Sequence, residues 1–369
     1  MSRRPIAIAC QGGGSQCAFV AGALKTLFAE RIQDRFDIVG LSGTSGGALT
    51  AGVAWYGMLK QARGDRTLVE DRIVGLWRDL TAQSPQEIAF DTLCIASLRM
   101  AERGYVPTYA SSPSSLPFRL WQKAAAAAIG RPEFTDLRAL LLKHLDFGAL
   151  TSLVGAESPV LLAGACDVLE GTFKIFSSAN SEIQVESLLA SAAIPTLFPA
   201  TMANGHAYWD GIFSSNPPVV GFFRRPYMGR QITIPQEVWI IQVNPSRYET
   251  VPEVPSEILD RRNHIAGNLS LRHELQLIAV MNLLLQEKAL SEEFRARFGL
   301  ESHEAITVRF IRMSEDLQRS LDYPSKLSRR PAHIARLMAD GEAQARAFLT
   351  QLGQEERAPA FVPAEAQLH

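Results

Sequence analysis

The sequence predicts an α/β fold in which helices cover both faces of a mainly parallel central sheet, giving three layers. Short apolar strands alternate with helix-like segments near the N-terminus, a pattern typical of parallel sheets. Residues 36–41 form an apolar run that leads into a glycine-flanked serine and then a helix. Residues 237–244 carry the apolar run of a strong buried strand.

The first 80 residues give the clearest elements. Residues 6–10 predict a short buried strand, and residues 11–17 a glycine-rich loop. Apolar side chains recur at helical spacing in the segments that follow, which predicts helices over residues 18–31, 48–61 and 68–80, with a strand over 36–41.

The stretch from 84 to 132 is less regular. Residues 105–117 contain three prolines and five serines and threonines, which excludes a continuous helix or a central strand there. We expect a surface loop, which is either a cap facing the substrate or a plain connection between helices.

Regular patterns return in the second half. They predict strands over 159–168, 172–176, 237–244 and 305–311, and helices over 185–193, 264–289 and 331–352. Residues 354–369 are polar with two prolines, so we expect this end of the chain to fray.

Composition narrows the class of protein. The chain has 369 residues, 47% hydrophobic and 20% charged, which is typical of a globular protein with a substantial core. Its formal net charge of -1 argues against nucleic acid as a partner. The cysteines (Cys10, Cys17, Cys94 and Cys166) show no zinc-site or disulfide spacing. Without an apparent signal peptide or spanning segment, we expect a cytoplasmic protein whose membrane contact, if any, is peripheral.

The pentapeptide Gly43-Thr44-Ser45-Gly46-Gly47 has the strand-turn-helix context of a nucleophile elbow. The turn is tight, so glycines such as Gly43 and Gly47 are needed beside the serine. The helix N-terminus that follows favours developing negative charge near Ser45. Taken alone, the motif fits an ordinary glycine- and serine-rich turn equally well.

The loop Gln11-Gly12-Gly13-Gly14-Ser15-Gln16-Cys17 lies between a predicted strand and a predicted helix. Successive glycine N–H groups can line a concavity that binds an anion. The chain lacks the P-loop lysine motif, and Cys17 replaces the third glycine of a dinucleotide fingerprint. Beside a nucleophilic serine, we therefore expect an oxyanion hole formed by the Gly12–Gly14 loop, with Gly13 and Gly14 as donors and Ser15 as a possible helper.

Trp209-Asp210-Gly211 supplies a carboxylate in an aromatic and apolar context. Burial there would raise the pKa of Asp210 and make it a general base. The alternative interpretation is a simple Asp-Gly turn.

In this order, the glycine loop, the elbow and Asp210-Gly211 together resemble the patatin-like phospholipase family. Residues 190–199, Ala-Ser-Ala-Ala-Ile-Pro-Thr-Leu-Phe-Pro, are similar to the family's segment before its aspartate. The resemblance covers residues 5–220 as a catalytic core. We expect residues 221–352 to complete the same domain and 353–369 to be a frayed tail. The resemblance implies a patatin-like fold. It also implies hydrolysis of acyl esters, typically of lipids, by a dyad of Ser45 as nucleophile and Asp210 as base, without metal or cofactor.

Two departures from the family pattern stand out. The loop usually reads G-G-G-x-[RK]-G, whereas Gln16 and Cys17 stand at its last two positions here. The loss of the basic residue weakens the local positive potential and puts a preference for anionic phospholipid in doubt more than catalysis. Ile212 stands where the aspartate motif commonly has glycine or alanine.

Several alternatives stay open. A Ser-Asp-His triad would need one of the histidines after Asp210, namely His264, His273, His303, His333 or His369. Other possibilities are an esterase for non-lipid acyl substrates such as hydroxyalkanoate oligomers or thioesters, and a non-catalytic protein that keeps the fold. Residues 222–227 pair aromatics with arginines and either touch a membrane or, more simply, pack inward. Homo-oligomer formation is also possible.

Overall fold

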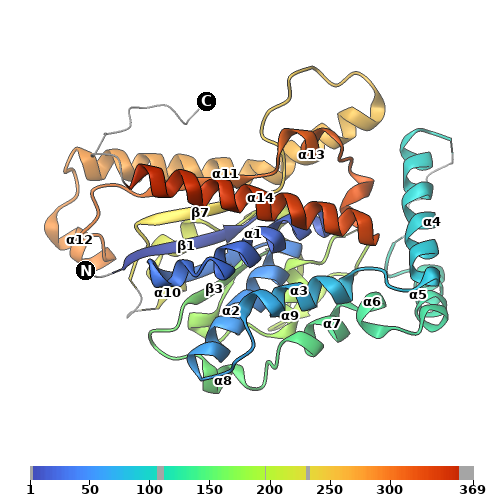
Figure 1. The fold of residues 1–369 in the computed structure, drawn as a ribbon, viewed down its shortest axis with the longest axis horizontal. Coiled ribbons are helices and arrows are strands. Elements are labelled where there is room, and N and C mark those ends of the chain that lie inside the picture. The colour runs from blue at the N-terminus through green and yellow to red at the C-terminus, as the bar shows by residue number, and fades with distance from the viewer. Residues whose placement is uncertain (1–2, 106–111, 196, 230–232, 357–369) are drawn as a thin grey trace.

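A mixed eight-stranded sheet forms the middle layer of the protein (Figure 1). The computed structural model describes residues 3–105, 112–195, 197–229 and 233–356. The strands are β1 (Arg4–Cys10), β2 (Phe36–Gly43), β3 (Val160–Asp167), β4 (Phe173–Ser177), β5 (Thr201–Ala203), β6 (His206–Asp210), β7 (Glu237–Gln242) and β8 (Thr307–Arg312).

The strand order is β5-β6-β3-β2-β1-β7-β8, with β4 paired to β3 outside this path. The five strands from β3 to β8 run parallel, while β4, β5 and β6 add antiparallel pairs. The predicted mainly parallel sheet is therefore confirmed. Its carboxyl-terminal edge gathers the loops after β1 and β2, which is where ligands bind in open α/β sheets.

Two hydrophobic cores lie on opposite faces of the sheet. Successive residues of a strand point to opposite faces, and in β1 Ile6 and Ile8 enter one core while Ala7 and Ala9 enter the other. The first core is covered by α1, α2, α3 and α14, and the second by α10 and α11. This arrangement confirms the predicted three layers.

The helices are mostly those the apolar periodicity predicts, with additions between residues 84 and 153. They are α1 (Ala18–Ala29), α2 (Gly46–Ala62), α3 (Val69–Leu80), α4 (Pro85–Glu102), α5 (Leu116–Ile129), α6 (Pro132–Thr135), α7 (Leu137–His144), α8 (Leu150–Leu153), α9 (Val185–Ser191), α10 (Arg225–Met228), α11 (Pro255–Gln286), α12 (Glu292–Phe298), α13 (Glu315–Arg319) and α14 (Pro331–Glu355). Two short 3-10 helices matter below, η1 (Gly14–Cys17) and η6 (Pro324–Leu327). No helix within the described ranges is long and apolar enough to cross a bilayer.

The segment expected to be irregular contains two of the longer helices, α4 and α5, so that expectation was wrong. Ser84 caps α4 through a capping box with Glu87, and Pro85 occupies the first turn. Of the predicted loop over 105–117, residues 106–111 lie outside the described residues, and Leu116 already belongs to α5.

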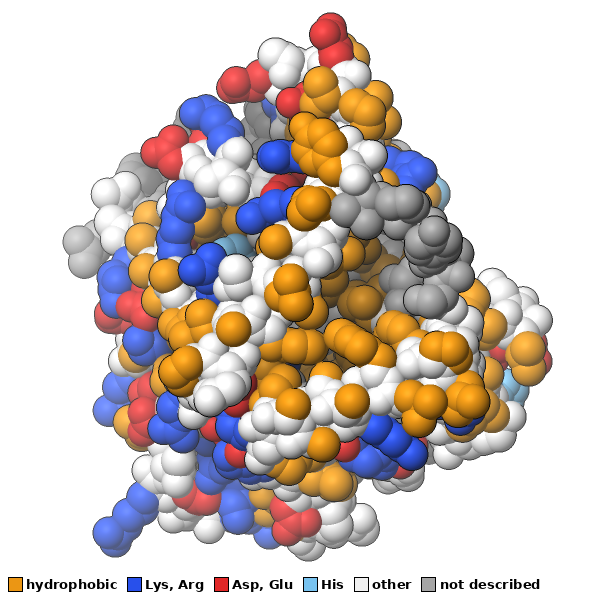
Figure 2. All heavy atoms as spheres, turned by 90° about the vertical axis from the view of Figure 1, so that its right-hand side faces the viewer, with side chains coloured by type: hydrophobic (Ala, Val, Ile, Leu, Met, Phe, Trp, Pro, Cys, Tyr) orange, Lys and Arg blue, Asp and Glu red, His pale blue; other side chains and the backbone are white. Residues whose placement is uncertain are grey.

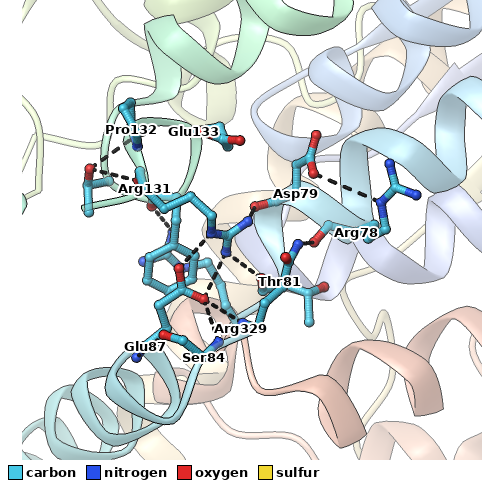
Figure 3. A network of polar contacts seen from close by, with 12 residues as sticks. Arg78, Asp79, Thr81, Ser84, Glu87, Arg131, Pro132, Glu133 and Arg329 are labelled. Atoms are coloured by element: carbon cyan, nitrogen blue, oxygen red, sulfur yellow. Dashed lines mark hydrogen bonds and ion pairs between the residues drawn. The ribbon is translucent and has the colours of Figure 1, made fainter. Parts of the chain in front are cut away.

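A partly buried arginine connects the base of the α4–α5 hairpin to the rest of the protein (Figure 3). Arg131, just after α5, forms an ion pair with Glu87 at the start of α4. It also donates to the carbonyl oxygens of Asp79 at 2.8 Å and Thr81 at 2.7 Å, at the end of α3. One guanidinium thus ties both ends of the hairpin to α3.

Three further boundaries differ from prediction. Helix α11 begins at Pro255, nine residues before the predicted start at His264. The short hairpin β5–β6, which ends at Asp210, was not predicted as strands. Helix α14 continues to Glu355, into the segment expected to fray, and residues 357–369 lie outside the described part.

Candidate active site

Ser45 stands on the sharp turn between β2 and α2. Its φ of 55° and ψ of -133° are unusual for a residue with a side chain. The turn is held by the Ser45 N–H, which donates to the Ser191 carbonyl oxygen at 3.0 Å. Ser45 is the N-cap residue of α2 and is only 5% exposed. This is the strained geometry of a nucleophile elbow.

The glycines on either side of Ser45 are required by close backbone approach. A Cβ on Gly43 would lie 2.6 Å from the Ala48 nitrogen, and one on Gly47 would lie 2.4 Å from the Cys10 carbonyl oxygen. No side chain fits at such distances without moving the backbone. The elbow is therefore packed directly against the end of β1 and the glycine-rich loop.

The sheet register brings Asp210 to the elbow. Gly43 of β2 pairs with Ala163 of β3, and Asp210 of β6 pairs with Ala165, two residues further along β3. Strand β4 pairs with the opposite edge of β3. Strand β6 therefore pairs with the same edge of β3 as β2 does, beyond the point where the pairing with β2 ends. Asp210 therefore lies just beyond the end of β2, where Ser45 begins the turn.

The carboxyl group of Asp210 is completely buried, and burial raises its pKa to about 7. Two hydrogen-bond donors oppose this effect, the Ile212 N–H at 2.9 Å from Oδ1 and the Ser45 hydroxyl. A carboxylate with a pKa near neutrality is suited to accept a proton at physiological pH.

Ser45 and Asp210 are close but not tightly bonded. The Ser45 hydroxyl lies near enough to lower the pKa of Asp210. Nevertheless, Asp210 Oδ2 is buried and finds no well-formed hydrogen bond among the described residues. A loose contact of this kind is common in enzymes without substrate, where the bond tightens only in the reacting complex.

The predicted oxyanion residues do not all offer a free donor. The Gly12 N–H already donates to Asn216 Oδ1 at 2.7 Å. The Gly13 N–H lies against Cys17 Sγ. Within the described ranges, the N–H groups of Gly13, Gly14 and Ser15 have no oxygen acceptor. Gly14 and Ser15 are therefore available donors in the described structure, whereas the Gly13 N–H faces only the weak sulfur acceptor of Cys17.

A buried polar network around this loop was missed by sequence reasoning. Gln11 Oε1 accepts from the Val243 and Asn244 N–H groups at 2.9 and 2.7 Å. Asn216 and Asn244 hold the Gly12 N–H and carbonyl oxygen, and Lys326 donates to Asn244. The Asn216-Pro217-Pro218 sequence after Asp210 was visible, but nothing in the sequence places Asn244 or Lys326 beside the loop.

The histidines considered for a triad have partners elsewhere. His264 is hydrogen-bonded to Tyr248, and burial lowers its pKa to about 3. His303 contacts the Pro235 carbonyl oxygen and His333 that of Ser325, while His273 is exposed. In the described part of the chain, no hydrogen bond or ion pair joins a histidine to Ser45 or Asp210. His369 lies outside the described residues.

Other features lie away from Ser45 and Asp210. A surface cavity of about 630 Å³ lies at the amino-terminal end of β2, lined by Phe36 and Ile38 among others, at the opposite end of the strand from Ser45. Phe222 and Phe223 are buried in the second core, so the membrane-contact interpretation of residues 222–227 fails for these aromatics. The described residues contain no cluster of acidic, histidine or cysteine side chains able to hold a metal.

Comparison with known proteins gives one family. The model described as patatin-like phospholipase matches residues 8–223. A search of curated proteins found no match. Among solved structures, VipD from Legionella pneumophila has 15% identity and a TM-score of 0.42 over 95% of this chain and 67% of its own. ExoU of the Pseudomonas aeruginosa type III secretion system, in complex with SpcU, has 16% identity and a TM-score of 0.26, over 80% of this chain and 59% of the matched chain.

Proposed function

This chain belongs to the patatin-like phospholipase family, and from that premise we propose that it hydrolyses acyl esters of lipids with Ser45 as nucleophile and Asp210 as general base. The match covers more than half of the chain and includes both residues. The single observation that carries the proposal is the meeting of a strained elbow serine with a fully buried carboxylate whose pKa is about 7.

The reaction begins when Ser45 Oγ attacks the ester carbonyl carbon and its proton passes to Asp210. The tetrahedral intermediate collapses as the carbon–oxygen bond to the leaving group breaks, and Asp210 returns the proton to the leaving alkoxide. Water then attacks the acyl-enzyme, giving its proton to Asp210. Collapse of the second intermediate releases the fatty acid, and Ser45 Oγ regains that proton.

The negative charge on the tetrahedral intermediate needs donors that are already in place. We assign this role to the N–H groups of Gly13 and Gly14, with Ser15 as a further donor, since these groups have no oxygen acceptor in the described structure. Gly12 acts indirectly, because its own N–H is committed to Asn216. The N-terminus of α2 adds a favourable dipole beside Ser45.

A dyad is favoured over a Ser-Asp-His triad. Each described histidine in the second half of the chain is exposed or contacts another group. The low pKa of His264 also keeps that imidazole neutral. Replacing His264, His303 and His333 singly with Asn should leave ester hydrolysis within a few-fold of wild type, whereas a triad would lose nearly all activity with one of them.

The exposed surface of helix α5 favours a lipid over a small polar ester. Helix α5 has no buried residue, and it exposes three large apolar side chains, Leu116, Leu120 and Trp121. Its charged residues, Arg119 and Lys123, are both cations. Figure 2 shows hydrophobic side chains gathered around a hollow on the side of the molecule where the hairpin lies. We propose that α5 rests on the lipid surface during catalysis, as interfacial helices do.

The experiment that tests the proposal is covalent labelling with a fluorophosphonate, followed by mass spectrometry of the labelled peptide. The expected result is a single adduct on Ser45, with labelling strongly slowed in Asp210→Asn. A folded wild-type protein that takes up no label would favour the non-catalytic alternative. Labelling with no turnover of long-chain lipid but rapid turnover of hydroxyalkanoate oligomers would favour the non-lipid esterase.

A further inference from the structure

Lys326 is a buried lysine beside the glycine-rich loop. It belongs to η6, which packs on η1. Gly14 has a φ of 59°, and a Cβ there would lie 2.2 Å from the Lys326 carbonyl oxygen, so the two backbones are in direct contact. Ser15 Oγ and Gln16 Nε2 also donate to Ser325, at 3.1 and 2.9 Å. Segments about 310 residues apart in sequence thus form one unit.

The ammonium group of Lys326 lacks the partner that buried cations usually have. Its Nζ donates to Asn244 Oδ1 at 2.7 Å, and no carboxylate within the described ranges lies at ion-pair distance. Burial lowers the pKa of Lys326 to about 8, with Cys17 and Asp260 acting in the opposite direction. The group therefore remains mostly protonated at pH 7. A buried charge without an ionic partner is costly, which points to a role beyond packing.

Asn244 links the ammonium group of Lys326 to the glycine-rich loop by hydrogen bonds. Its Nδ2 donates to the Gly12 carbonyl oxygen at 3.2 Å, while its Oδ1 accepts from Lys326. In a trans peptide the carbonyl and the following N–H point in opposite directions. Holding the Gly12 carbonyl therefore turns the Gly13 N–H away from Asn244, toward Cys17 Sγ.

The orientation of this peptide matters because the loop touches the elbow. A Cβ on Gly12 would lie 3.0 Å from Ser45 Cβ, and one on Gly46 would lie 3.1 Å from Cys17 Sγ. On its other side, Gly12 is fixed through its N–H by Asn216, whose Nδ2 donates to the Gly267 carbonyl oxygen at 2.9 Å. In the described structure the Gly12 carbonyl oxygen is held by the Asn244 side chain, which is in turn bonded to Lys326.

We propose that Lys326 is a positioning residue of the hydrolase: acting through Asn244, its buried ammonium holds the Gly12–Gly13 peptide with the Gly13 N–H on the side of Cys17 Sγ and the elbow, and it places positive charge beside the oxyanion donors. This inference rests on the proposed function. Gln16 of the loop is neutral and is engaged with Ser325. A cation from η6 therefore supplies positive charge where the loop has none of its own.

The test compares Lys326→Met, Asn244→Leu and the double variant with wild type. Lys25→Met is the matched control, because Lys25 is a partly exposed lysine on α1 paired with Glu342. The expected result for Lys326→Met is a fall in kcat of about tenfold to a hundredfold on a soluble ester, with little change in KM. Because the two side chains act in series, the double variant should be no worse than the more impaired single variant.

A second measurement uses the wild-type protein and does not depend on the variants folding. The titratable groups facing the ammonium are Cys17 from the loop, and Asp260 and His264 from α11. Burial raises the pKa of Cys17 to about 12 and lowers that of His264 to about 3, so the thiol and the imidazole do not titrate near pH 8. We therefore expect kcat to fall as the pH rises through about 8, and Lys326→Met to lack this basic limb.

Hydrogen exchange of the peptide covering residues 11–17 separates this inference from the proposed function. The expected result is exchange at least several-fold faster in Lys326→Met than in wild type or Lys25→Met. A folded Lys326→Met with wild-type kcat and unchanged exchange would overturn the inference, as would a wild-type kcat that stays flat to pH 9.5. If the wild-type protein has no esterase activity at all, the proposed function fails, while the exchange data still decide whether Lys326 holds the loop.

Discussion

At the scale of a single residue, the backbone conformation of Ser45 suits the nucleophilic role that we propose for it. Its positive φ is maintained by the Ser191 carbonyl, by the glycines around it and by the start of α2. Such strain persists only where the surrounding structure over-determines it. At this position it holds the hydroxyl at the end of β2, facing the carboxylate that β6 delivers.

The pH dependence of the reaction follows from the burial of Asp210. The base must be ionised to accept the serine proton, and burial raises the pKa of Asp210 to about 7. We therefore expect kcat/KM on a soluble ester to fall about tenfold per pH unit as the pH drops below 7. A pH-rate profile at saturating and limiting substrate checks this, and a profile that stays flat down to pH 5 would contradict the assignment.

At the scale of elements, the α4–α5 hairpin depends on the ion pair at its base between partly buried Arg131 and buried Glu87. Burial alone would raise the pKa of Glu87, but Arg131 and the N–H groups of Gln83 and Ser84 outweigh it and lower that pKa. Arg131→Met would leave this carboxylate buried without its cation. We expect a loss of about 3 kcal/mol in the free energy of unfolding, or local loss of the hairpin, measured by urea denaturation and limited proteolysis.

Arg66→Met is the control for that experiment, since Arg66 is an exposed arginine outside the network. It should change the free energy of unfolding by less than about 0.5 kcal/mol. Equal stability of the two variants would mean that the hairpin is held by its apolar contacts instead.

The proposed lipid contact of α5 gives a second prediction at this scale. Replacing Leu120 and Trp121 together with Ser removes two exposed apolar side chains from the helix. We expect binding to phosphatidylglycerol-containing liposomes to weaken about tenfold or more in a sedimentation assay, with turnover of a soluble ester unchanged. The matched control is Leu283→Ser with Leu284→Ser, which are exposed near the far end of α11. Equal liposome binding by both double variants would end this proposal.

At the scale of the whole molecule, the N- and C-terminal parts form one body. Helix α14 packs along α1, and Phe348 stacks edge-on against Trp239 of the central strand β7. The helices approach closely at Gly22 and Gly341, where a Cβ would lie about 2 Å from the Met338 and Phe19 carbonyl oxygens. This contact is consistent with residues 221–352 completing the domain that begins at the N-terminus.

That close approach can be tested by adding one methyl group. Gly341→Ala should reduce the free energy of unfolding by about 1–3 kcal/mol, because the backbone of α1 has to move. Gly353 lies in the same helix with nothing within 4 Å of its Cβ position. Gly353→Ala should be neutral or stabilise by about 0.5–1 kcal/mol. Thermal and urea unfolding of both variants would show the contrast, and a stabilising Gly341→Ala would contradict the packing.

Much of this architecture was predictable because it depends on local patterns. The apolar runs of β1, β2 and β7 and the helical periodicity of α1, α2 and α14 all gave the correct element. The three layers followed from their alternation. The sharp turn at Ser45 between β2 and α2 was also predictable, because a glycine-flanked serine between strand and helix is a local feature.

The rest depends on contacts between distant segments. Helices α4 and α5 were missed because prolines near 105–117 dominated the pattern, although Ser84, Pro85 and Glu87 already marked a helix start. The strand β6 was missed because it is short and pairs with β3 only beyond the end of β2. Lys326 and Asn244 reach the glycine loop through tertiary structure alone, and no local pattern distinguishes them from surface residues.

The most direct test of the central claim is hydrolysis of a p-nitrophenyl ester series, from short to long acyl chains, by wild type, Ser45→Ala and Asp210→Asn. We predict that the wild-type protein is active, with an optimum at long acyl chains, and that both variants lose activity by about a thousandfold or more while remaining folded. Equal activity in all three proteins, or loss in Ser45→Ala but not in Asp210→Asn, would contradict catalysis by this dyad.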